Sequence, residues 1–197
     1  MKAVKTYLAL GDSYTIGEAV PAAESFPYQL QDALVKRGHS VESLKIIAQT
    51  GWTTAELQAA IAAETVHPPY DLVTLLIGVN NQYRGYSVVN YRVEFEQLLR
   101  QAIVFAGEDT DRVRVLSIPD WGVTPFAQKE GRSPEKIARE IDSFNEAAQE
   151  ISENLGVVFM NSTPHSRLAA TDLSLLASDG LHPSGKMYAQ WVQSLLS

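Results

Sequence analysis

Three side-chain types that together perform nucleophilic catalysis stand far apart in this sequence. An apolar run is followed by the segment GDSY, which contains Ser13, and a much later segment, DGLHP, contains Asp179 and His182. A serine hydroxyl becomes a good nucleophile when an imidazole accepts its proton and a carboxylate orients that imidazole. Asp179 and His182 lie three residues apart, so both side chains can face the same way in a turn and hydrogen-bond. The pairing predicts a serine hydrolase in which folding must bring only Ser13 to its partners.

Taken separately, either segment has an ordinary structural meaning, a turn for Gly-Asp-Ser and a helix start for Asp-x-x-His. Two further sites favour chemistry. The apolar run 72–77 ends at GVNN, which contains Asn80, and the run 44–48 ends at QTG, which contains Gly51. Acyl transfer needs hydrogen-bond donors aimed at the carbonyl oxygen that becomes negative. An asparagine amide supplies one donor, and a glycine lets the backbone approach closely enough for its N–H to supply another.

With these sites the chain resembles the SGNH, or GDSL-type, hydrolase family, whose four motif blocks carry a Ser, a Gly, an Asn and an Asp-x-x-His in that order. The matching residues here are Ser13, Gly51, Asn80, and Asp179 with His182. The third block of the family commonly reads Gly-x-Asn-Asp, whereas this chain has the neutral Asn81 after Asn80. No Gly-x-Ser-x-Gly occurs in the sequence, which argues against the nucleophile elbow of α/β-hydrolases.

Apolar runs of strand length alternate with stretches of helical periodicity, as parallel β-α-β units require. The predicted strands are 4–10, 44–48, 72–77, 113–118 and 157–160, and helical patterns cover 26–34, 53–63, 91–105, 133–155 and 187–195. This alternation predicts an α/β fold, a three-layer α/β/α sandwich around a five-stranded parallel sheet. The resemblance implies the flavodoxin-like strand order 2-1-3-4-5. Ser13 and Asn80 would then lie side by side at the carboxyl edge, where ligands collect in open α/β sheets.

The composition predicts one domain over residues 1–197 and a small-molecule partner. With 45% hydrophobic and 20% charged residues, the 197-residue chain can bury a sizeable core. A formal net charge of −7 without a basic block argues against nucleic acid and anionic membranes. The chain has no cysteine, and its four histidines lack metal-ligand spacing, so no disulfide, cofactor or metal is expected; they are His39, His67, His165 and His182.

The first predicted strand starts at Val4, which leaves no room for a signal peptide in this sequence. No apolar stretch approaches the roughly 20 residues that a membrane helix needs. We therefore expect a cytoplasmic protein without stable membrane insertion.

The candidate residues predict a two-step acyl transfer. Ser13 Oγ attacks an ester carbonyl while His182 takes its proton and later returns it to the leaving alcohol. Asp179 orients His182, and water then releases the acyl group. The expected oxyanion hole consists of the N–H groups of Ser13 and Gly51 together with the Asn80 amide.

Five residues are candidates for substrate contacts, each with a structural alternative: Asp12, Tyr83, Arg84, Trp121 and Phe126. Asp12, beside the nucleophile, is also a rival carboxylate for the imidazole, but its expected role is to accept hydrogen bonds from loop amides. Trp121 and Phe126 follow the fourth strand and either line an acyl pocket or form the packed underside of a loop. Tyr83 and Arg84 follow the third motif block, where Arg84 either contacts an anionic leaving group or is paired structurally.

The favoured function is a carboxylic ester hydrolase for small or short-chain acyl esters, including O-acetylated sugars. A lysophospholipase or an acyl-CoA thioesterase would use the same catalytic groups with a longer apolar groove. An acyltransferase would pass the acyl group to an alcohol in place of water. The alternative from another class is a non-catalytic carbohydrate-binding protein on the same fold, but binding alone gives no reason to keep Ser, His and Asp together.

Overall fold

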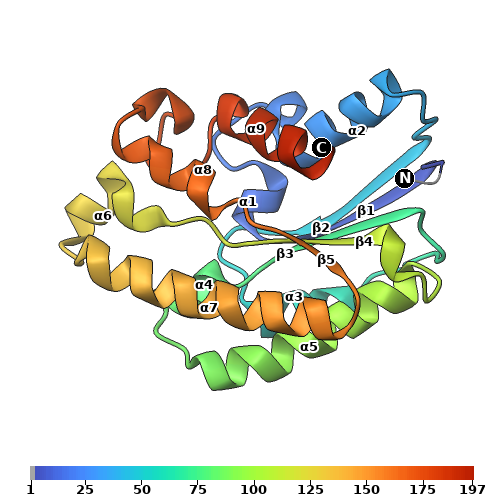
Figure 1. The fold of residues 1–197 in the computed structure, drawn as a ribbon, viewed down its shortest axis with the longest axis horizontal. Helices are drawn as coiled ribbons and strands as arrows, with labels where there is room; N and C mark the ends of the chain where they lie inside the picture. The colour runs from blue at the N-terminus through green and yellow to red at the C-terminus, as the bar shows by residue number, and fades with distance from the viewer. Residues whose placement is uncertain (1–2) are drawn as a thin grey trace.

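The computed structural model describes residues 3–197 and contains a parallel sheet of five strands in the order β2-β1-β3-β4-β5 (Figure 1). The four neighbouring pairs are all parallel. The predicted α/β class, strand number and strand order are therefore confirmed. The strands are β1 Thr6–Gly11, β2 Ser43–Ala48, β3 Leu72–Leu76, β4 Val113–Leu116 and β5 Val158–Met160.

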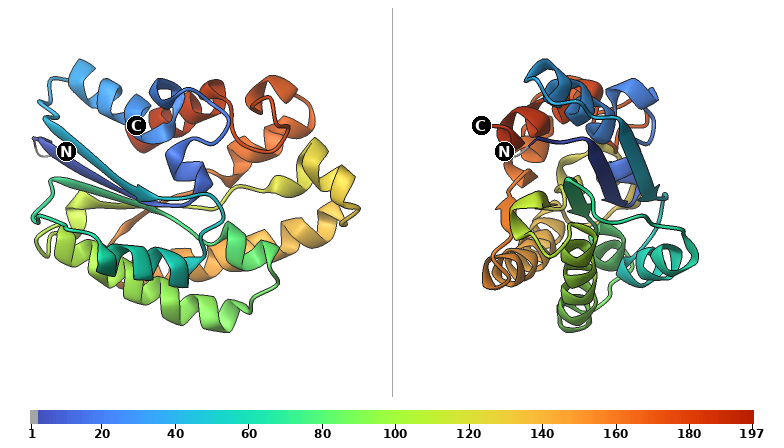
Figure 2. Two further views of the ribbon diagram at one scale, coloured as in Figure 1. Left: turned by 180° about the vertical axis from the view of Figure 1, so that it is seen from behind. Right: turned by 90° about the vertical axis from the view of Figure 1, so that its right-hand side faces the viewer.

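Helices cover both faces of the sheet, as Figures 1 and 2 show. On one face α2 (Phe26–Lys36) packs against α9 (Gly185–Leu195). On the other face α5 (Val88–Phe105) packs against both α3 (Thr54–Ala63) and α7 (Pro134–Asn154). Because both faces are covered, β3 is buried at every position, which explains its continuous apolar sequence. The predicted three-layer sandwich is confirmed.

Shorter helical segments connect these elements. Four are α-helical: α1 Ser13–Ile16, α4 Val79–Tyr83, α6 Pro125–Glu130 and α8 Thr163–Arg167. The 3-10 segments are η1 Ala22–Glu24, η2 Thr110–Arg112, η3 Trp121–Val123, η4 Leu168–Ala170 and η5 Leu173–Leu175.

The long helices begin and end where local capping signals lie. Ser133 accepts a hydrogen bond from the Lys136 N–H at the start of α7, and Gly156 adopts a φ of 70° just beyond its end. At the start of α3 the side chains of Thr53 and Glu56 form a reciprocal capping box. These signals are local, which is why the predicted boundaries of both helices agree with the structure to within one residue.

The segments that follow β3 and β4 are helical, which the sequence analysis did not predict. Residues after β3 form α4, because Gly78 adopts a φ of 131° and turns the chain directly from the strand into a helix. A Cβ at Gly78 would lie 2.7 Å from the Tyr91 ring, so both the conformation and the space require glycine. The predicted fourth strand, 113–118, ends at Leu116, and Trp121 then begins η3.

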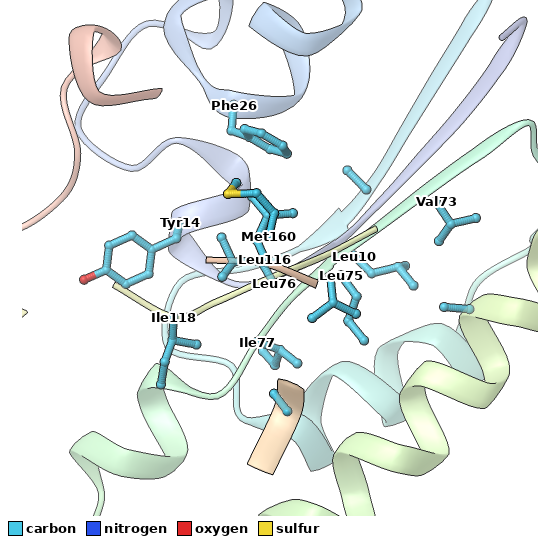
Figure 3. Close-up of a cluster of buried hydrophobic side chains, with 14 of the residues drawn as sticks. Leu10, Tyr14, Phe26, Val73, Leu75, Leu76, Ile77, Leu116, Ile118 and Met160 are labelled. Atoms are coloured by element: carbon cyan, nitrogen blue, oxygen red, sulfur yellow. The ribbon is translucent and has the colours of Figure 1, made fainter. Parts of the chain in front are cut away.

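The core lies on both sides of the sheet. Figure 3 shows side chains of β1, β3 and β4 packed with Phe26 of α2 and Tyr14 of α1, all of them buried. Tyr14 directly follows Ser13, so the core anchors the turn that carries the candidate nucleophile. No helix within residues 3–197 is long and apolar enough to cross a membrane.

Candidate active site

Ser13 lies at the carboxyl end of the central strand β1. Asp12 caps α1 by accepting a hydrogen bond of 3.0 Å from the Tyr14 N–H, and Ser13 is the first residue of that helix. A side chain at Gly11 would collide with the Leu76 carbonyl oxygen, 2.4 Å from its Cβ. The tight strand-to-helix turn therefore depends on Gly11 and fixes where the Ser13 hydroxyl projects.

The second segment, 177–183, forms a closed turn that holds Asp179 and His182 together. The Ala177 N–H donates to the His182 carbonyl at 2.8 Å, and Asp179 Oδ1 accepts the N–H groups of Leu181 and His182, each at 3.0 Å. Asp179 Oδ2 lies 2.6 Å from His182 Nδ1. On its other side His182 Nε2 lies 3.0 Å from Ser13 Oγ. The structure thus brings together the three residues proposed from sequence as the nucleophile, the general base and acid, and the carboxylate that orients the imidazole.

Electrostatics around Asp179 favour its charged form. Partial burial alone would raise the pKa of this carboxyl, but hydrogen bonds from the His182 ring and from two backbone N–H groups outweigh it and lower the pKa. The Tyr14 ring packs against the His182 ring at a centroid distance of 5.3 Å, which further restricts the imidazole. An ionised Asp179 places the ring proton on Nδ1 and leaves Nε2 to accept the Ser13 proton.

Asn80 and Gly51 line the same pocket as Ser13 and His182. Asn80 lies in α4, and its Nδ2 donates to the Trp52 carbonyl at 2.9 Å, which uses one of its two amide hydrogens. Gly51 adopts a φ of 85° in the loop after β2. Within the described chain no hydrogen-bond acceptor receives the N–H of Ser13 or of Gly51, so both donors are available to a ligand.

The pocket has a volume of about 190 Å³ and one aromatic wall, formed by Tyr83, Trp121 and Phe126. The Tyr83 and Phe126 ring centroids lie 5.4 and 6.0 Å from that of Trp121. Trp121 is also a packed residue, because its Nε1 donates to Gln82 at 2.8 Å and the Arg132 guanidinium lies 4.9 Å above its ring. Trp121 therefore lines the pocket and is also a packed residue, while its contact with an acyl group stays a prediction.

Two of the candidate substrate-contacting residues lie outside this pocket. Asp12 is only 1% exposed and accepts a hydrogen bond from the Tyr14 N–H in the turn. Arg84 Nη2 donates to the Gly51 carbonyl at 2.6 Å, and its Nη1 lies 3.3 Å from Glu56. The structure thus places both residues in the structural alternatives that the sequence analysis described.

Sequence reasoning missed several residues that shape the site. Gln82 joins the Trp121 ring to Glu140, and Asn81 binds the first residue of α3, Thr54. The spacing of the segment gives no sign of these contacts, since each partner lies 27 or more residues away. A larger groove of about 780 Å³ lies between α2 and α9 but contains none of the candidate catalytic residues. Residues 3–197 contain no group of three or more His, Cys, Asp or Glu that could hold a metal ion.

A five-stranded sheet of this order, with a Ser, a His and an Asp gathered at its carboxyl edge, defines the SGNH-type α/β class of hydrolases. A model of the GDSL-like Lipase/Acylhydrolase family matches residues 9–190, and the chain belongs to this family. None of the curated proteins compared with the sequence matches it significantly.

Solved structures share the fold at low sequence identity. TesA is 17% identical over 98% of this chain and 96% of its own, with a TM-score of 0.76. A lipase/acylhydrolase from Enterococcus faecalis is 18% identical over 98% and 93%, with a TM-score of 0.75. The W215I variant of Axe2, an acetyl xylan esterase from Geobacillus stearothermophilus, is 19% identical over 100% and 95%, with a TM-score of 0.67.

Proposed function

We propose that this protein hydrolyses carboxylic esters with small or short-chain acyl groups, including O-acetyl esters, through an acyl-enzyme on Ser13. The observation that best supports the proposal is the continuous hydrogen-bonded series from Asp179 through His182 to Ser13, which opens on a pocket also lined by Asn80 and Gly51. A protein that only binds its ligand gains nothing from such a series.

In the first half-reaction Ser13 Oγ attacks the ester carbonyl while its proton passes to His182 Nε2, 3.0 Å away. His182 gives this proton to the departing alcohol oxygen, and the Asp179 carboxylate stabilises the transient imidazolium. In the second half-reaction His182 takes a proton from water, which attacks the acyl-enzyme. The carboxylic acid leaves as Ser13 regains its proton.

The carbonyl oxygen becomes negative in both tetrahedral intermediates and needs donors already in place. We assign this role to the N–H groups of Ser13 and Gly51 and to the Asn80 amide. The absence of another acceptor for either N–H among residues 3–197, and the second amide hydrogen of Asn80, support the assignment. All three residues line the pocket that also contains His182.

The size of the pocket favours a substrate with a small acyl group. Its volume of about 190 Å³ is below the roughly 300–1,000 Å³ of pockets that enclose drug-sized ligands. The rings of Trp121 and Phe126 close one side of the pocket. One structural relative, Axe2, is described as an acetyl xylan esterase, and an acetyl group is of the size that such a pocket accepts. A lysophospholipase or acyl-CoA thioesterase would need a longer groove.

The test is hydrolysis of p-nitrophenyl esters from acetate to palmitate by the wild-type protein and by Ser13→Ala. We expect the highest kcat/KM for the shortest acyl chains and loss of activity by several orders of magnitude in the variant. Thermal unfolding of both proteins controls for folding. A preference for palmitate would favour the lysophospholipase or thioesterase alternative, and an added alcohol that outcompetes water would indicate an acyltransferase. Activity that survives in Ser13→Ala would contradict the proposed nucleophile.

A further inference from the structure

Two side chains from one turn of helix donate hydrogen bonds to consecutive carbonyl groups of the loop that carries Gly51. Arg84 Nη2 donates to the Gly51 carbonyl at 2.6 Å, and Asn80 Nδ2 donates to the Trp52 carbonyl at 2.9 Å. Asn80 and Arg84 are four residues apart at α4 and its C-cap, so their side chains lie on the same face. The two contacts together fix both peptide planes that follow Gly51.

Arg84 is itself held by Glu56, which lies in the first turn of α3, directly after this loop. Glu56 Oε1 lies 3.3 Å from Arg84 Nη1, while Glu56 Oε2 accepts the N–H and the hydroxyl of Thr53 at 2.8 and 2.9 Å. The guanidinium therefore bridges the Gly51 carbonyl and the capping box at the start of α3. Its planar arrangement of several donors suits two simultaneous acceptors, which a lysine ammonium satisfies less well.

Gly51 has no side chain with which to anchor itself, so its conformation depends on contacts of the loop backbone. Its φ of 85° lies in the left-handed region, and the nearest atom to a Cβ placed there is Arg84 Nη2 at 3.9 Å. The flanking contacts are a long hydrogen bond of 3.3 Å from the Trp52 N–H to Gln49 and a contact between Thr50 and Glu18. Because glycine has no side chain to pack, Gly51 can rotate about φ and ψ once its carbonyl is released, and such a rotation would swing its N–H away from the pocket.

We propose that Arg84 is a positioning residue that keeps the Gly51 N–H aimed into the oxyanion hole. This inference rests on the function proposed above, because it assumes that the Gly51 N–H stabilises the oxyanion. Arg84 touches neither the substrate pocket nor Ser13, so it acts through the loop alone. Without Arg84 the site retains its nucleophile, its base and two of its three donors.

The expected loss is smaller than that for removal of the nucleophile. Loss of one oxyanion donor costs about 10²–10³-fold in kcat, and a misplaced donor should cost part of this. We expect Arg84→Met, which keeps the aliphatic stem, to lower kcat by about 10–100-fold with little change in KM. Arg84→Lys retains a donor for the Gly51 carbonyl and should recover most of the lost kcat.

A pair of inhibitors separates positioning from a general structural defect. A trifluoromethyl ketone accepts Ser13 Oγ at its carbonyl carbon, the Ser13 proton passes to His182, and the ketone oxygen becomes an alkoxide in the oxyanion hole. The matching methyl ketone binds mainly without this addition. We expect the Ki of the trifluoromethyl ketone to rise in Arg84→Met by the same factor as kcat/KM falls, while the Ki of the methyl ketone stays unchanged.

Arg100→Met provides a matched control, since Arg100 also pairs with a glutamate, Glu96, but lies on the exposed surface of α5. Equal trifluoromethyl ketone affinity in wild type and Arg84→Met, beside an inactive Ser13→Ala, would overturn the positioning role and leave the proposed function intact. A KM increase confined to anionic esters would overturn it too, because it would assign Arg84 to leaving-group binding. If Arg84→Met fails to fold, the shorter and uncharged Arg84→Gln takes its place, and a trifluoromethyl ketone Ki equal to that of wild type would then overturn the positioning role.

Discussion

The residue that follows Asn80, the proposed oxyanion donor, differs from the family's usual aspartate, and its contacts explain how the chain accommodates the change. Asn81 is buried and accepts the Thr54 N–H at 3.1 Å through Oδ1, while its Nδ2 donates to Thr54 Oγ1 at 2.7 Å. The Thr54 hydroxyl in turn donates to Glu94. An aspartate has no hydrogen to donate, so it would compete with Glu94 for the single Thr54 hydroxyl hydrogen.

We therefore predict that Asn81→Asp lowers the free energy of unfolding by about 1–3 kcal/mol, because one buried acceptor loses its donor. Adding Glu94→Gln should restore part of this loss, since the glutamine amide supplies the missing hydrogen. Denaturant unfolding at neutral pH of the two single variants and the double variant measures the coupling. Equal and additive effects of the two substitutions would contradict this account.

At the scale of elements, the aromatic wall formed by side chains of α4, η3 and α6 bounds one side of the pocket. Phe126 of α6 is partly exposed and contacts both Trp121 of η3 and Tyr83 of α4, with ring centroids 6.0 and 6.4 Å away. Trp121 is fully packed and hydrogen-bonded, so its removal would disturb the fold as well as the pocket. Phe126 is the better position at which to open the wall.

Phe126→Ala should raise kcat/KM for hexanoate and octanoate esters relative to acetate, because the truncated side chain lengthens the pocket. The measurement is the ratio of kcat/KM values across the p-nitrophenyl ester series. Tyr28→Ala removes an aromatic ring from the distant groove between α2 and α9 and should leave this ratio unchanged. An unaltered profile in Phe126→Ala would mean that the acyl chain leaves the pocket by another side.

The elements that could be predicted from sequence are those with local signals. Strands β1 to β5 and the long helices appear as apolar runs, helical periodicity and caps, so their predicted ends lie within a few residues of the observed ones. The five residues of α4 carry no apolar period, and only Gln82 among them is a good helix former. Their helix depends on partners 27 to 58 residues away, such as Thr54 for Asn81 and Glu140 for Gln82.

In the candidate site, too, the features with local sequence signals were predictable and those that depend on distant partners were not. The triad was predictable because Asp179 and His182 are close in sequence and Ser13 follows a strand. The positioning role proposed for Arg84 was not predictable, since it depends on a carbonyl group 33 residues away. Every residue has a backbone carbonyl, so a sequence motif cannot show which carbonyl accepts a hydrogen bond.

At the scale of the whole molecule, one buried carboxyl links the stability of the fold to pH. Asp12 has one oxygen hydrogen-bonded to the Tyr14 N–H, while its Oδ2 is buried without a partner among the described residues. Burial raises the pKa of Asp12 to about 7, although the Tyr14 hydrogen bond partly offsets this. In an unfolded chain the carboxyl would titrate near its usual value of about 3.9.

Between roughly pH 4 and pH 7 the native state therefore keeps a proton on Asp12 that the unfolded state releases. Stability must fall as the pH rises through this window and then become independent of Asp12 above it. Asp12→Asn does not titrate, so its free energy of unfolding should rise relative to that of wild type by about 2–3 kcal/mol from pH 5 to pH 8. Denaturant unfolding of both proteins at these two values checks this, and parallel profiles would contradict it.

The Ser13–His182 contact joins residues 169 positions apart, and this separation has a consequence for synthesis on the ribosome. At about 5–20 residues per second, the hydroxyl leaves the peptidyl-transferase centre roughly 10–30 s before its imidazole is made. With Ser13 and His182 in the roles proposed above, a nascent or truncated chain carries an inert alcohol. Ester cleavage then begins only when the segment around residues 177–183 has been translated and has packed beside β1. During refolding, the recovery of esterase activity would therefore measure when this segment reaches Ser13.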